Sequence, residues 1–82
     1  MSRTKQYIED SAEVEESAVL VAHTEDHREA LRELGALFRR CGVLAAGYAD
    51  PELVARMLVQ DAAETYRAER WLIRSTTAAL AA

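Results

Sequence analysis

Apolar residues recur every three or four positions along most of the chain, which is the spacing of one face of an α-helix. The cleanest stripe lies in the middle of the chain and predicts an amphipathic helix over residues 25–46. Cys41 falls within this stripe, so we expect its thiol to pack in the core rather than to react. The stripe consists of Ala30, Leu31, Leu34, Leu37, Phe38, Cys41, Leu44 and Ala45.

The following helix has a well-marked start. Asp50 can accept hydrogen bonds from the first backbone amides, Pro51 suits the first helical position, and Glu52 is favourable in the first turn. Apolar positions then share one broad face again, which predicts a helix over residues 51–76 and an alanine-rich tail after it. Because the connecting loop is short, the two helices should form an antiparallel hairpin.

The front of the chain allows more than one interpretation. Ser11 followed by acidic residues is typical of a helix start, which predicts a helix over residues 11–22. Residues 24–26 are suited to capping a separate second helix, yet the helical phase also continues through them, so one unbroken helix is equally consistent. The β-branched residues within 17–22 leave a short strand as a further option.

The composition limits the stability that a single copy of such a domain can reach. The 82 residues include sixteen alanines but only one Phe and one Trp, so each buried residue removes little apolar area from water. We expect residues 1–7 to form a flexible N-terminus and residues 8–82 to form a single all-α domain. Homodimerisation into a four-helix or six-helix bundle would complete its core; a monomeric three-helix bundle is the alternative.

Charge is unevenly distributed along the chain. The formal net charge is −4, and the segment from Glu9 to Glu29 contains eight acidic residues and one basic residue. This excess argues against binding to nucleic-acid phosphates and favours contact with a basic patch on a partner protein or on a second copy. The candidate partner-binding residues are Glu9, Asp10, Glu13, Glu15 and Glu16 in the acidic segment and Arg67, Arg70 and Arg74 in the last helix.

Sequence features also bear on location. One cysteine cannot form a disulfide within the chain, so the fold does not depend on an oxidising compartment. No uncharged stretch approaches the roughly 18 residues that cross a bilayer. The chain begins with polar residues that lead into acidic ones, so neither a signal peptide nor membrane association is expected, and a cytoplasmic location follows.

His23 and His27 are the residues best suited to metal chemistry. Their i, i+4 spacing places both imidazoles on one helical face, where they could share a zinc or iron ion. Pairing across the predicted hairpin brings Glu69 to within ~4 Å of this level, and Glu16 lies one heptad earlier on the same stripe. The simpler interpretation has His27 stacked on Trp71 and His23 exposed near a helix cap, with no cofactor.

Two carboxylates interrupt the apolar face of the last helix. A carboxylate in a small core costs several kcal/mol unless it is paired. We therefore expect Asp61 at the edge of this face, reaching water, and Glu69 paired with an arginine of another helix or chain.

Glu9, Asp10 and Glu13 form a carboxylate cluster. The cluster resembles the Glu-Glu-x-x-Glu half of the magnesium motif in all-α nucleotide pyrophosphohydrolases, the MazG-like family. That resemblance implies carboxylates that hold a metal ion against a triphosphate. The second half of the motif, Glu-x-x-Asp one helix later, is absent: Arg28 and Arg32 stand where its aspartate belongs.

These features favour a small non-enzymatic protein–protein interaction module that acts as a regulator, adaptor or inhibitor of a larger partner through an acidic front face. The alternative is a metal-binding helical bundle built around His23 and His27, catalytic in the manner of ferritin-like or MazG-like bundles.

Overall fold

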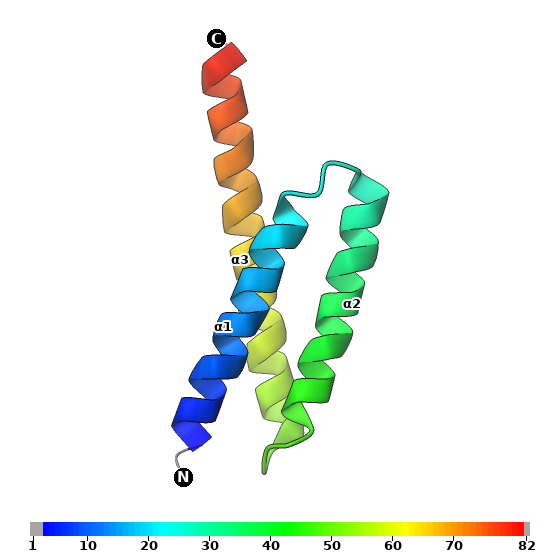
Figure 1. The fold of residues 1–82 in the computed structure, drawn as a ribbon, viewed down its shortest axis with the longest axis vertical. Helices are drawn as coiled ribbons and strands as arrows, with labels where there is room; N and C mark the ends of the chain where they lie inside the picture. Colours follow the sequence, from blue (N-terminus) through cyan, green and yellow to red (C-terminus); the bar gives the residue numbers. More distant parts are fainter. Residues whose placement is uncertain (1–2, 82) are drawn as a thin grey trace.

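The computed structural model describes residues 3–81, and these form three α-helices and no strand (Figure 1). Helix α1 spans Arg3–Ala22, α2 spans His27–Ala45 and α3 spans Pro51–Ala81. The helices run up, down and up, so α2 is antiparallel to both others and α1 lies parallel to α3. The all-α fold and the hairpin of the last two helices are confirmed.

Helix α1 begins well before the predicted start at residue 11. Residues 3–7, which we expected to belong to a flexible N-terminus, are helical; residues 1–2 lie outside the described part. The early start has two physical reasons. Lys5 and Gln6 are good helix formers, and Tyr7 packs against the core cluster, which holds the first turns in place.

Helices α1 and α2 are separate, so the chain does not form one continuous front helix. It turns at residues 23–26, where Asp26 caps α2: its carboxylate accepts hydrogen bonds from the backbone amides of Arg28 at 2.9 Å and Glu29 at 3.4 Å. Residues 17–22 belong to α1, so the possible strand does not form.

Helix α3 starts as predicted and ends later. The Asp50 carboxylate accepts a hydrogen bond from the amide of Leu53 at 3.2 Å, which caps the helix. The helix then continues to Ala81, past the predicted end at residue 76, because alanine has the highest helix propensity. Its last turns project beyond the ends of α1 and α2 (Figure 1).

The core is small and contains more alanine and cysteine than large apolar residues. Leu58, Val14 and Cys41 are the largest fully buried side chains, and the Cys41 thiol is free. The burial predicted for Cys41 is confirmed. The central cluster joins Val14 and Ala18 of α1, Leu37 and Cys41 of α2, and Leu58 and Ala62 of α3.

The molecule is thin, and much of its apolar surface is exposed. Its Cα atoms extend over 51 × 23 × 15 Å, and Figure 1 views it along the shortest of these dimensions. None of the helices in residues 3–81 is long and apolar enough to cross a membrane. Large apolar side chains that remain exposed are Ile8, Leu20, Leu31, Val43, Leu53, Met57, Trp71, Leu72 and Leu80.

Candidate functional site

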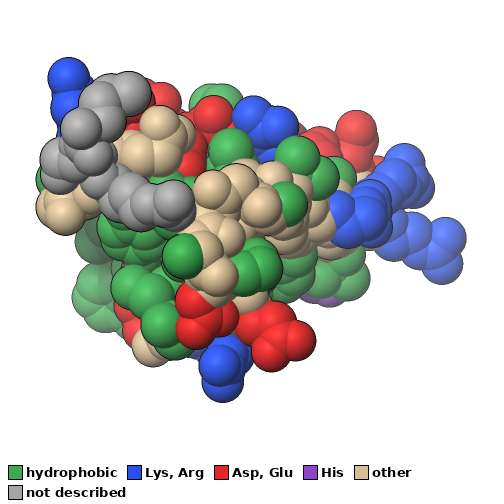
Figure 2. Space-filling view, turned by 90° about the horizontal axis from the view of Figure 1, so that it is seen from below, with side chains coloured by type: hydrophobic (Ala, Val, Ile, Leu, Met, Phe, Trp, Pro, Cys, Tyr) green, Lys and Arg blue, Asp and Glu red, His purple; other side chains and the backbone are tan. Residues whose placement is uncertain are grey.

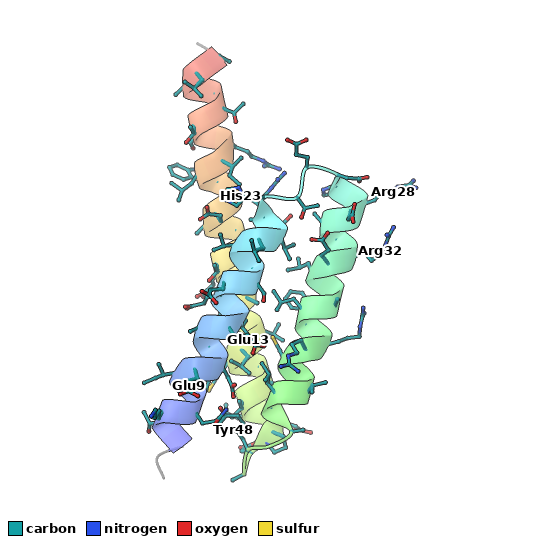
Figure 3. All side chains as sticks on the ribbon, in the orientation of Figure 1. Glu9, Glu13, His23, Arg28, Arg32 and Tyr48 are labelled. Atoms are coloured by element: carbon teal, nitrogen blue, oxygen red, sulfur yellow. The ribbon has the colours of Figure 1, made fainter. Side chains whose placement is uncertain are left out.

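One row of exposed residues follows the side of α1 that borders α2. Glu9, Glu13 and Glu16 recur at intervals of four and three residues, and Leu20 continues the row. All four side chains are exposed, and 73% of Leu20 is open to solvent. Glu9 and Glu13 are labelled on this helix in Figure 3. Three of the predicted acidic residues therefore share one surface.

A second exposed row, on α2, is basic. Arg32 and Arg39 lie seven positions apart on one side of the helix. Ala36 lies between them and Val43 follows Arg39, so the row continues at intervals of three or four residues. Val43 is 64% exposed. In Figure 2 basic side chains project on the right, the side on which α2 lies in Figure 1, and Figure 3 shows Arg32 pointing away from α1.

An open groove lies between α1 and α2, and all of its lining residues come from these two helices. Two side-chain hydrogen bonds between described residues join its two sides. Arg40 Nε donates a hydrogen bond to Glu13 Oε2 at 3.1 Å, and the Thr24 hydroxyl donates to Glu33 at 2.9 Å. The groove is lined by Ser17, Leu20, Val21, Glu33, Ala36, Leu37 and Arg40.

We call the surface formed by the two rows and the groove the front face. It combines an acidic edge, a basic edge and an apolar strip between them. Its exposed residues are Glu9, Glu13, Glu16 and Leu20 of α1 and Arg32, Ala36, Arg39, Arg40 and Val43 of α2.

Asp10, a predicted partner-binding residue, lies inside the bundle and does not belong to this face. The residue is only 7% exposed. Its carboxylate accepts a hydrogen bond from the Tyr48 hydroxyl at 2.6 Å and from the Gln6 amide at 3.2 Å. These partners turn Asp10 inward, away from Glu9 and Glu13. The carboxylate cluster that resembles the MazG-like motif is therefore not displayed on one surface.

Glu15 is exposed, but helical spacing places it on the flank of α1 that faces away from the groove. It therefore does not share a surface with the acidic row of the front face.

The predicted arginine row on α3 is divided. Arg67 and Arg74 are exposed, whereas Arg70 donates a hydrogen bond to the backbone carbonyl of Ala22 at 3.1 Å. Arg70 therefore helps to satisfy the carboxyl end of α1. None of the three lines the front face.

The structure brings two of the three predicted metal ligands together. His23 Nε2 and Glu69 Oε1 lie 3.1 Å apart, so the predicted proximity of Glu69 is confirmed, although its partner is a histidine rather than an arginine. His27, the first residue of α2, is exposed and does not join them. Among residues 3–81, no three His, Cys, Asp or Glu side chains are grouped so as to hold a metal ion. A site that uses all three predicted ligands is not formed.

We expected Asp61 to lie at the edge of the apolar face and reach water. In the structure its carboxylate accepts hydrogen bonds from two hydroxyl groups. Tyr7 donates to its Oδ2 at 3.1 Å and Ser11 donates to the same atom at 3.2 Å. Burial and the hydrogen bond to Asp61 raise the pKa of the Tyr7 hydroxyl above its ordinary value of 10.0. Burial likewise raises the pKa of the Cys41 thiol, so the only cysteine stays protonated and unreactive at neutral pH.

Two features were not predicted from the sequence. One is the basic row on α2, although Arg32 and Arg39 recur at the seven-residue spacing that marks one surface. The other is the hydrogen bond of Tyr48, which lies in the loop before α3. No local pattern predicts its bond to Asp10, because the two residues lie 38 positions apart in the chain.

No protein-family model, no curated protein and no solved structure matches this chain.

Proposed function

We propose that this chain is a small, non-enzymatic helical protein–protein interaction module that acts as a regulator, adaptor or inhibitor of a larger partner. The observation that carries the proposal is the front face, where charged rows flank exposed apolar side chains on the broadest side of a thin molecule. Full burial of a Leu or Val side chain contributes about 1.5–3 kcal/mol relative to exposure. Covering Leu20 and Val43 would therefore favour binding.

The acidic edge of the front face supports a partner with a basic patch. Glu9 and Glu16 form no ion pair or hydrogen bond with any residue in the described range 3–81, whereas Glu13 is paired with Arg40. Two carboxylates thus remain available to arginines or lysines of a partner. Charges at the rim of an apolar contact steer association and select the partner's orientation.

The positions of the reactive side chains favour a binding role over catalysis. The Cys41 thiol is buried, and the Asp10 carboxylate is enclosed by Tyr48 and Gln6. The Asp61 carboxylate is held by two hydroxyl groups. In each case the group that could act as a nucleophile or base instead stabilises the bundle.

Capture from a lysate of cells that naturally contain the chain tests this proposal. The wild type is compared with Glu16→Lys, which reverses a charge on the front face, and with Glu25→Lys. The control makes the same change in charge at an exposed residue of the α1–α2 turn. We expect one protein to be retained by the wild type and by Glu25→Lys and lost with Glu16→Lys. Equal retention by all three would show that the front face is not the binding surface.

A further inference from the structure

Charge on the front face differs between the two helices. The α1 edge carries three exposed carboxylates, Glu9, Glu13 and Glu16, and the α2 edge carries three exposed guanidinium groups, Arg32, Arg39 and Arg40. Two carboxylates of α2 reduce this contrast: Glu33 lines the groove, and Glu29 is exposed seven positions before Ala36. A face with one acidic and one basic edge is complementary to a copy of itself turned so that the two edges exchange places.

The contacts within one chain show which residues lie at the same height along the two helices. Glu13 is level with Arg40, and Thr24 is level with Glu33, because each pair is in direct contact. Between these two pairs, Glu16 lies at about the height of Arg39, and Leu20 lies at about the height of Ala36, since α1 and α2 are antiparallel.

Two copies can stack front to front with the helices aligned in two ways. If the two-fold axis runs along the helices, α1 of one copy lies over α2 of the other and heights are preserved. Glu16 then meets Arg39 of the second copy, and Leu20 meets its Ala36. If the axis runs across the helices, α1 lies over α1, which opposes carboxylates to carboxylates and arginines to arginines. Like charges placed opposite each other cost several kcal/mol, so charge selects the first arrangement.

We propose that a second copy of this chain covers the front face, with the two-fold axis along the helices and the acidic edge of each copy on the basic edge of the other. This inference rests on the proposed function, in that it uses the same binding surface, and it names the partner of that surface. A larger partner that uses the front face would then bind the monomer and compete with self-association.

The size of the face fits such a dimer. A 20-residue helix is about 30 Å long, and two neighbouring helices are about 18 Å wide, so two stacked faces bury roughly 1,000 Å² in total. This area lies just below the roughly 1,200–2,000 Å² of stable specific interfaces, in the range of weak, transient ones. A dimer of this size dissociates at accessible concentrations, which makes its affinity measurable.

A charge exchange between Glu16 and Arg39 tests the arrangement. Glu16→Arg alone opposes two arginines, and Arg39→Glu alone opposes two glutamates, each twice in a homodimer because of the two-fold axis. We expect either variant to weaken dimerisation by about 100-fold. When the two variants are mixed, both contacts regain opposite charges in a heterodimer, so affinity should return to near the wild-type value.

Sedimentation equilibrium measures the mass of each sample, with helicity checked by circular dichroism. We expect the wild type to approach twice its 9.1 kDa at about 100 µM. Glu15→Arg serves as the control, because Glu15 is exposed on the flank of α1 away from the groove, and it should dimerise like the wild type.

Three results would overturn the dimer: a mass of 9.1 kDa for the wild type at every concentration, single variants that associate as well as the wild type, or a mixture that stays monomeric. If the wild type is monomeric but still retains a protein from a lysate, the dimer fails and the interaction function stands. If it dimerises as described but captures no other protein, the larger partner is wrong and the dimer stands.

Discussion

The hydrogen bond between Tyr48 and Asp10 involves a buried carboxylate, so removing the Tyr48 hydroxyl should lower the free energy of unfolding. It joins the loop before α3 to a carboxylate that is only 7% exposed, over 2.6 Å. A hydrogen bond to a charged group contributes about 1.5–3 kcal/mol to stability. In Tyr48→Phe the ring remains, but among the described residues Asp10 keeps only the Gln6 amide as a side-chain partner.

We therefore expect Tyr48→Phe to lower the free energy of unfolding by about 2 kcal/mol, which corresponds to a fall in Tm of roughly 8–16 °C for a domain of this size. Urea denaturation followed by circular dichroism at 222 nm measures this change, with all samples at one protein concentration. Tyr66→Phe is the matched control, because Tyr66 is half-buried and its hydroxyl forms no hydrogen bond with residues 3–81. It should change stability by less than about 0.5 kcal/mol.

A double-mutant cycle with Asp10→Asn isolates the pair. If the bond acts as described, the double variant Tyr48→Phe/Asp10→Asn should lose at least about 1 kcal/mol less than the sum of the two single variants. Strict additivity, or a loss for Tyr48→Phe no larger than that for Tyr66→Phe, would refute the reasoning.

Three further predictions concern the core and its titratable groups. Because Leu58 is fully buried, Leu58→Ala should lower the free energy of unfolding by about 2–5 kcal/mol in urea denaturation. The control Leu80→Ala, at a residue that is 84% exposed, should lower it by less than about 0.5 kcal/mol. Similar losses in the two variants would contradict the assignment of Leu58 to the core. Because the folded state raises the pKa of Tyr7, the unfolded chain loses this proton first, so stability is retained below about pH 10 and declines above it. The urea midpoint should therefore fall less steeply with pH in Tyr7→Phe than in the wild type between about pH 8 and 11. The same dependence on pH in both proteins would contradict this role of Tyr7. The Cys41 thiol should react with a disulfide reagent only as fast as the protein unfolds, and immediate labelling of the native protein would disagree with its burial.

Much of the helical framework was predictable because its signals are local. The Asp50–Pro51 start of α3 depends on capping chemistry within one turn, and the α2 stripe depends on a repeat within one helix. The start of α1 was missed because the helix propensity of Lys5 and Gln6 does not by itself fix it. The first turns are also held by a distant contact: Tyr7 donates a hydrogen bond to Asp61, 54 positions away, which no local pattern predicts.

The acidic segment shows why surface residues are harder to predict than helices. Asp10 looks like its neighbours by charge, yet it lies four residues before Val14 and eight before Ala18, on the buried line of α1. That spacing predicts that Asp10 is buried. It was overlooked because Asp10 lies in a segment rich in acidic residues. The nearness of His23 and Glu69 was predicted, but from the wrong geometry: the expected hairpin paired the last two helices, whereas His23 follows α1, which lies parallel to α3.

The measurement that tests the central claim most directly is an isotope-filtered NOE experiment on an equal mixture of ¹³C-labelled and unlabelled protein, which detects only contacts between copies. If the front face is a self-complementary binding surface, methyl protons of Leu20 should show NOEs to Ala36 of the second copy, and residues of the projecting end of α3, such as Leu80, should show none. Intermolecular NOEs confined to the end of α3, or none at all at millimolar concentration, would contradict the account.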